Sequence, residues 1–166
     1  MTDADHQKEI EDRLWDEMPR GFTGMLGLAG GEGGHFQPMT AFAEREEGTI
    51  WFFTRKETDL ARAVAASPGD AMFIVQKDRE LQACIGGTMR QDHDQARIDA
   101  YWGPVVAAWY PEGKDDPALT LLRFECRDAQ VWLSKSGPLK FAWEIARANL
   151  RDRMPDLGER ASLNMT

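Results

Sequence analysis

The run Ile50-Trp51-Phe52-Phe53-Thr54 is the feature that most constrains the fold of this chain. Its five consecutive β-branched or aromatic residues favour a buried strand. The run ends at charges and hydroxyls, in the segment from Arg55 to Asp59, and then gives way to a short segment with helical spacing. A strand that ends in this way just before a helix is a place where proteins hold phosphate groups.

Further segments with strand patterns lie on both sides of this run. A glycine cluster over 29–34 is suited to a hairpin turn, and residues 78–80 form a tight polar turn. The pair Gly86-Gly87 predicts a bulge or a close approach of another backbone, and Asp128 marks a bend in the last strand. The expected strands cover residues 22–28, 35–43, 49–54, 72–77, 81–90, and finally 120–125 with its continuation over 129–133.

Helices are expected between and around these strands. Ile10, Leu14 and Met18 form one apolar stripe on an N-terminal helix over about 6–18. Shorter helices are expected over 60–65 and 92–102, a proline-containing loop over 104–117, and a C-terminal helix over about 138–151 with Phe141, Ile145, Ala148 and Leu150 near one face. Residues beyond Arg153 are expected to form a loose tail.

Six short, mostly consecutive strands with inserted helices favour an antiparallel sheet closed into a small barrel over a βαβ array. The predicted class is mainly β with flanking helices (α+β), with the barrel over about 21–133. A chain of 166 residues with 42% hydrophobic residues is the size of one domain, so residues 1–166 are expected to form a single unit.

Charge and cysteine content narrow the classes of function. Twenty basic against 28 acidic residues give a net charge of -8, which disfavours nucleic acid and anionic membrane surfaces as partners. Cys84 and Cys126 lie far apart without a CxxC motif, which is typical of core thiols in a reducing cytoplasm. The N-terminus lacks the pattern of a signal peptide, and no apolar run reaches membrane-spanning length. We therefore expect a soluble cytoplasmic protein.

Four segments in this order, 35–40, 50–54, 87–88 and 109–117, resemble the general stress protein branch of the pyridoxamine 5'-phosphate oxidase-like FMN-binding split-barrel superfamily. The resemblance covers roughly residues 14–132. It implies a six-stranded antiparallel split barrel and a homodimer with two flavin sites at the interface, each built from both subunits. The cofactor that it implies is FMN or FAD.

The resemblance also implies roles for particular residues. The strand over 37–40 and the pair Phe53-Thr54 are similar to segments that run along the isoalloxazine ring, and Thr58 matches the hydroxyl that holds the phosphate. Gln82 is similar to a glutamine at the polar edge of the flavin, and Trp132 to a tryptophan that approaches from the partner subunit. The implied cofactor-binding residues are Gln37, Pro38, Met39, Thr40, Phe53, Thr54, Arg55, Lys56, Thr58, Gln82 and Trp132.

The chain departs from the oxidases that act on pyridoxamine phosphate. Those enzymes carry an Arg-Lys pair after the phosphate hydroxyl, where this chain has Asp59-Leu60, and their second basic pair falls near Gln37 and Phe42. A hydrogen bond to a charged group contributes about 1.5–3 kcal/mol, so two lost contacts weaken FMN binding by about two to four powers of ten unless they are replaced. Arg55, Lys56 and Arg62 are the candidate replacements. Pyridoxamine 5'-phosphate oxidase activity is therefore not expected.

Each functional interpretation has a plain alternative. Thr54 can simply end a strand, Thr58 can be only a helix N-cap, and Trp132 can serve core or interface packing. His6, His35 and His93 show no metal-ligand spacing, so no metal is assigned.

The first hypothesis is a flavin-binding stress protein and flavin-dependent oxidoreductase of unknown substrate, with no catalytic side chain named. The alternative is a non-catalytic split-barrel binding protein that has lost tight flavin binding.

Overall fold

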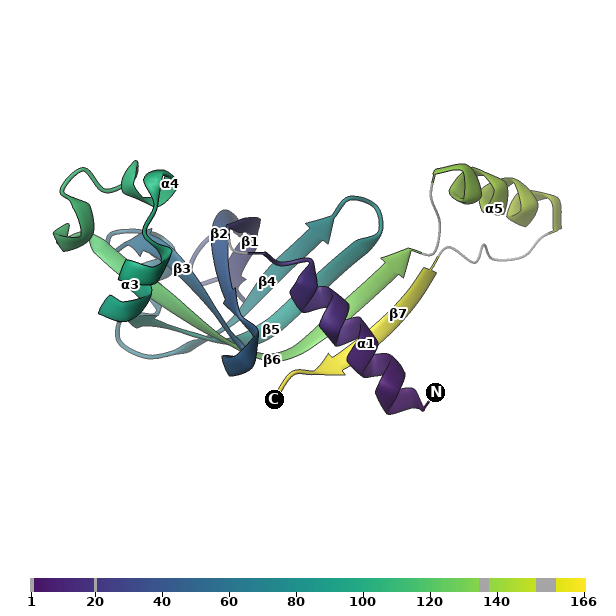
Figure 1. Cartoon of the computed structure of the whole chain (residues 1–166), viewed down its shortest axis with the longest axis horizontal. Coiled ribbons are helices and arrows are strands. Elements are labelled where there is room, and N and C mark those ends of the chain that lie inside the picture. The colour runs from purple at the N-terminus through teal and green to yellow at the C-terminus, as the bar shows by residue number, and fades with distance from the viewer. Residues whose placement is uncertain (1, 20, 135–137, 152–157) are drawn as a thin grey trace.

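Seven antiparallel strands form one sheet in the part of the chain that the structure, a computed structural model, describes: residues 2–19, 21–134, 138–151 and 158–166 (Figure 1). The strand order is β3-β2-β1-β4-β5-β6-β7, and an additional pairing of β3 with β6 closes the first six strands into a barrel. The predicted six-stranded antiparallel barrel is confirmed. The strands are β1 (Phe22–Leu28), β2 (Gln37–Glu44), β3 (Thr49–Arg55), β4 (Gly69–Lys77), β5 (Leu81–Asp92), β6 (Leu119–Ser134) and β7 (Gly158–Asn164).

The expectation of a loose C-terminal tail is wrong for residues 158–164, because they form β7. Strand β6 is 16 residues long, and β3 pairs with its first half while β7 pairs with its second half on the same edge. Leu163 of β7 is buried in the barrel core, and Ala161 packs against that core. One alanine and one leucine among polar residues gave too weak a strand pattern for recognition in the sequence.

The N-terminal helix α1 (Asp3–Asp16) packs on the barrel through the predicted stripe, since Ile10, Leu14 and Met18 are all buried. It begins earlier than expected because Thr2 and Asp5 form a capping box. The C-terminal helix α5 (Pro138–Arg151) has the expected bounds. Figure 1 shows it beyond the end of the barrel where β6 ends.

A second hydrophobic cluster lies outside the barrel, where the segment between β5 and β6 covers β2 and β3. Helix α3 (Gln95–Tyr101) contributes Ile98 and Tyr101, which pack with Phe42 and Trp51. The expected loop over 104–117 in fact contains helix α4 (Pro104–Ala107) and the 3-10 turn η2 (Gly113–Asp115). The remaining elements are the 3-10 turn η1 (Arg45–Glu47) and helix α2 (Asp59–Ala63).

The predicted irregularity at Gly86-Gly87 is confirmed. Gly86 pairs with Asp128 and Gly87 with Cys126, so Arg127 is the extra residue of a bulge in β6. A Cβ atom on Gly87 would lie 2.1 Å from the carbonyl oxygen of Glu125, so only glycine permits this close approach. No helix in the described ranges is long and apolar enough to span a membrane.

Candidate functional site

Strands β2 and β3 pair over only part of their length. Residues 42–44 of β2 pair with residues 49–51 of β3. Residues 37–41 pair only with β1, and residues 52–55 pair only with β6. We call this parting of the two strands the β2–β3 split, with residues 37–41 on one side and 52–55 on the other. The two segments that the sequence predicted to run along a flavin ring therefore lie where β2 and β3 no longer pair with each other.

Two threonine hydroxyls meet at the end of β3. Thr54 is only 8% exposed, and its Oγ1 lies 3.3 Å from Oγ1 of Thr58. Thr58 is the N-cap of α2, because its Oγ1 accepts a hydrogen bond from the backbone N–H of Ala61 at 3.3 Å. The same hydroxyl donates to the carbonyl oxygen of Arg55 at 2.9 Å. Thr58 is thus a cap in this structure, and the capping geometry holds its hydroxyl beside that of Thr54.

Sequence reasoning missed two polar residues next to this pair. Thr120 faces Thr54 directly across the β3–β6 pairing, and its hydroxyl lies 3.4 Å from Oε1 of Gln91. The Gln91 side chain donates to the carbonyl oxygen of Ala61 at 2.6 Å, which ties α2 to the end of β5. Only the strand register brings these residues together, so no local pattern could have identified them.

The three candidate cations differ in their surroundings. Arg55 Nε donates to the Glu57 carboxylate at 2.6 Å, and this hydrogen bond raises the pKa of Arg55. Lys56 and Arg62 are exposed and form no ion pair with any residue that the structure describes. Leu60 is 1% exposed and lies in the barrel core, whereas Asp59 faces solvent.

Gln82 and Trp132 lie far from the threonine pair. They sit directly opposite each other on β5 and β6, with Trp132 43% exposed and the Arg160 guanidinium 5.7 Å from its ring centroid. Trp132 is twelve residues along β6 from Thr120, the partner of Thr54, which corresponds to about 40 Å of strand. Within one chain, Gln82 and Trp132 therefore form a group that is separate from the Thr54–Thr58 pair.

The group around Trp132 belongs to an exposed sheet face. Met25 pairs with Ile74, and Ile74 pairs with Cys84, so these side chains point to the same side of the sheet. The large apolar residues exposed on this face are Met25, Met72, Ile74 and Trp132. We call these four residues the exposed sheet face.

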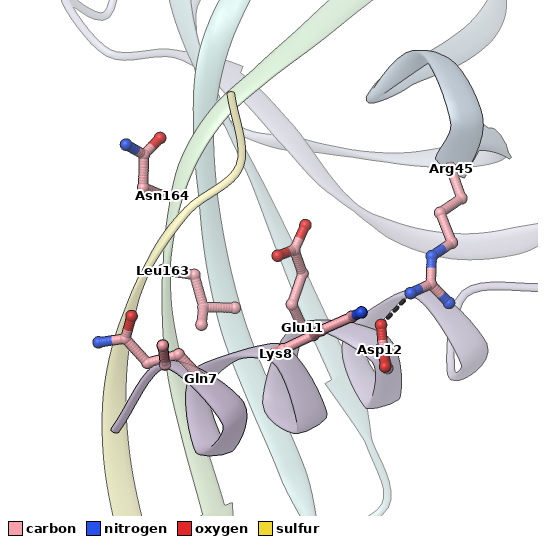
Figure 2. A pocket seen from close by; sticks show the side chains of 8 residues that line it. Gln7, Lys8, Glu11, Asp12, Arg45, Leu163 and Asn164 are labelled. Atoms are coloured by element: carbon pink, nitrogen blue, oxygen red, sulfur yellow. Dashed lines mark hydrogen bonds and ion pairs between the residues drawn. The ribbon is translucent and has the colours of Figure 1, made fainter. Parts of the chain in front are cut away.

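A groove of about 440 Å³ lies elsewhere, between α1, η1 and β7 (Figure 2). Arg45 and Asp12, which both line it, form an ion pair, and Figure 2 shows these two side chains meeting at one end. Its lining residues are Ala4, Gln7, Lys8, Glu11, Asp12, Arg45, Leu163 and Asn164, and none of them is a predicted flavin residue. The groove mixes charges of both signs and its arginine is already neutralised, so the β2–β3 split is the better candidate site.

The side chains at the split are suited to bind an anion, through the two threonines, and an aromatic ring, beside Phe53. Phe53 packs edge-on against Trp102 at 6.2 Å between ring centroids, and Tyr110 lies 6.5 Å from Phe53. Burial raises the pKa of Tyr110 to about 12, so its phenol stays protonated near neutral pH. Neither the threonine pair nor this aromatic group offers an acid or base that titrates near neutrality, and the arrangement therefore favours binding over proton transfer.

Comparison with known proteins gives one consistent answer. A family model described as pyridoxamine 5'-phosphate oxidase like matches residues 8–156. A protein of Jannaschia sp. CCS1 assigned as general stress protein 26 shares 36% identity, covering 95% of this chain and 99% of the other, with a TM-score of 0.77. A general stress family protein of Xanthomonas campestris pv. campestris shares 42% identity over 82% of this chain and 93% of the other, with a TM-score of 0.71.

A third solved structure is the general stress FMN/FAD binding protein of Xanthomonas citri. It shares 41% identity, covers 78% of this chain and 92% of the other, and has a TM-score of 0.70. A search of curated proteins found no match.

Proposed function

Because this chain belongs to the pyridoxamine 5'-phosphate oxidase-like family, we propose that it is a general-stress-type protein that binds FMN or FAD at the β2–β3 split and serves as a flavin-dependent oxidoreductase. The relative from Xanthomonas citri, an FMN/FAD binding protein at 41% identity, supports the choice of cofactor. The observation that carries the proposal is the Thr54–Thr58 hydroxyl pair, which lies at the end of the strand that borders the split. Free thiols at Cys84 and Cys126 favour the cytoplasm as its location.

The residues present fit a flavin phosphate. Two hydroxyls lie within hydrogen-bond distance of each other, and Lys56 and Arg62 carry positive charge with no ion-pair partner in the described ranges. When bound, the flavin supplies the hydride and electron transfer. Thr54 would donate its hydroxyl to the phosphate, Thr58 would do so by turning its hydroxyl hydrogen away from the carbonyl oxygen of Arg55, and Phe53 would provide an apolar surface beside the ring. The threonines and Phe53 position the cofactor and contribute no proton.

The proposed assembly is a homodimer with two flavin sites. About 40 Å of strand separates Trp132 from the threonine pair, so Trp132 reaches a flavin held by Thr54 only from a second copy of the chain. The exposed sheet face supplies the apolar surface that a stable dimer buries. Sedimentation velocity tests this: Ile74→Glu should give a monomer, and a monomeric wild type would rule out the assembly.

The alternative is a binding protein that has kept the fold without tight flavin binding. Leu60 supports it, because this side chain lies in the core at a position where the pyridoxamine phosphate oxidases carry a cation. Asp59 supports it as well, since an exposed carboxylate beside Thr58 repels a phosphate.

The experiment is a titration of the purified apo-protein with FMN and with FAD, followed by flavin fluorescence. Thr54→Val removes one hydroxyl at constant shape, and Thr58→Asp keeps a capping oxygen while adding a negative charge at the phosphate position. Both should weaken binding, whereas Thr58→Ser, which keeps hydroxyl and cap, should bind as the wild type does. A wild type that binds neither flavin would overturn the proposal and favour the alternative.

A further inference from the structure

We propose that Lys56 and Arg62 are the cations that bind the cofactor phosphate in this chain, and that Arg55, although closest in sequence to Thr54, is not. This inference rests on the proposed function, and it names the residues that replace the basic pair missing at Asp59 and Leu60. Of the three cations near Thr58, one is already paired with a carboxylate in the described part of the chain.

Arg55 is committed to another partner. Its Nε donates to the Glu57 carboxylate at 2.6 Å, and the Glu57 pKa is lowered chiefly by this hydrogen bond. The other guanidinium N–H groups of Arg55 remain able to donate, but the adjacent Glu57 carboxylate offsets the positive charge that would attract a phosphate. Arg55 therefore serves to neutralise Glu57 and keeps its negative charge from acting on the site.

Lys56 and Arg62 lie on either side of Thr58 and are not committed. Lys56 is two residues before Thr58, and its backbone is fixed because its N–H donates to the carbonyl oxygen of Ala118 at 2.8 Å. Arg62 lies one helical turn after Thr58, so its side chain projects from the same side of α2. The Arg62 charge acts on Glu57 only at longer range, and no carboxylate pairs with either side chain in the described part of the chain.

The local charge supports the same assignment. The chain carries a net charge of -8, yet residues 55–62 hold three cations against two carboxylates. With Glu57 paired to Arg55, Asp59 is the only carboxylate in this segment left to oppose Lys56 and Arg62. Outside the segment Asp116 also acts on Arg55, so Lys56 and Arg62 are the cations of this segment left to favour an anion beside Thr58.

The test is a comparison of FMN with riboflavin, which has the same ring without the phosphate. Lys56→Gln and Arg62→Gln should each weaken FMN binding about tenfold while riboflavin binding stays unchanged. The matched control is the double variant Arg55→Gln, Glu57→Gln, which removes the pair together and leaves the net charge unchanged, and it should bind FMN within about twofold of the wild type. Lys77→Gln, at the end of β4 far from α2, corrects for the change in net charge and should behave like the wild type.

The outcomes distinguish a failure of the cation assignment from a failure of the proposed flavin binding. If the wild type binds FMN and the double variant Arg55→Gln, Glu57→Gln binds it more weakly while Lys56→Gln and Arg62→Gln do not, the assignment of cations is wrong and the flavin site stands. If riboflavin binding falls in parallel with FMN binding, the two residues do not act on the phosphate and the assignment is again wrong. If the wild type binds neither compound, the proposed function fails and this inference fails with it.

Discussion

The guanidinium carbon of Arg97 lies 4.8 Å from the centroid of the Trp51 ring. Arg97 comes from α3, and it also donates to both carboxylate oxygens of Glu44, at 3.2 and 2.9 Å. Its remaining ion-pair partners are Glu47 at 2.7 Å and Asp94 at 2.9 Å. One side chain therefore fastens the segment between β5 and β6 to the strand that borders the candidate site.

Replacing Arg97 by methionine should lower the free energy of unfolding by about 1.5–3 kcal/mol, because the half-buried Glu44 loses its charged donor while the side-chain volume is kept. Urea denaturation followed by tryptophan fluorescence measures this. Arg127→Met is the matched control, since Arg127 is 51% exposed and its pairs with Asp70 and Asp128 should contribute less than about 0.5 kcal/mol. Equal losses in the two variants would contradict the role given to Arg97.

Glu44 should make stability depend on acid. Burial raises the pKa of this carboxyl, but hydrogen bonds from Arg97 and Tyr101 and the charge of Arg97 outweigh that effect, so its pKa lies below the ordinary value of 4.5. The unfolded chain therefore takes up the proton first, and the stabilisation is present above pH 4.5 and is lost as the pH falls through the folded pKa. Urea denaturation at a series of acidic pH values should show a smaller loss of stability in Glu44→Gln than in the wild type. Parallel curves would show that another group is responsible.

Much of the barrel could be predicted because its strands carry local signals. The aromatic run over 50–54 and the apolar run at the start of 72–77 mark strands, and Gly86-Gly87 marks the bulge. The helices were recognisable from the apolar stripe of α1 and from the capping threonine of α2. In each case the side chains that determine the structure lie within one element.

The parts that could not be predicted depend on contacts between distant segments. Strand β7 owes its position to pairing with β6 and to Leu163 in the core, and its own sequence is mostly polar. The Gln91 bond to Ala61 and the split between β2 and β3 arise from sheet register. Register also decides that Thr54 pairs with Thr120 at the start of β6, whereas Trp132 lies near the end of that strand, although the sequence places Thr54 and Trp132 in one predicted site.

Gly87→Ala should destabilise the barrel strongly. The added Cβ would meet the carbonyl oxygen of Glu125 at 2.1 Å, and that oxygen belongs to backbone in the middle of a paired strand. We expect a loss of about 1–3 kcal/mol, the usual range for an overpacked position. Gly103→Ala is the control, because its Cβ would meet nothing within 4 Å. Thermal unfolding of both variants measures the difference, and a Gly87→Ala protein as stable as the control would disprove the close approach.

The contact between His6 and Glu159 should couple β7 to pH. The hydrogen bond to Glu159, followed by the charge of that carboxylate, raises the pKa of His6 above its ordinary value of 6.5. Stabilisation by the charged imidazole is therefore fully present below pH 6.5 and is lost as the pH rises through the folded pKa. An NMR titration should find the His6 pKa above 6.5 in the wild type and lower in Glu159→Gln. Glu9→Gln should change it less, because Glu9 lies 3.9 Å from the other ring nitrogen and is a weaker influence. If removing either carboxylate lowers the pKa equally, the contact between α1 and β7 is not the source of the shift.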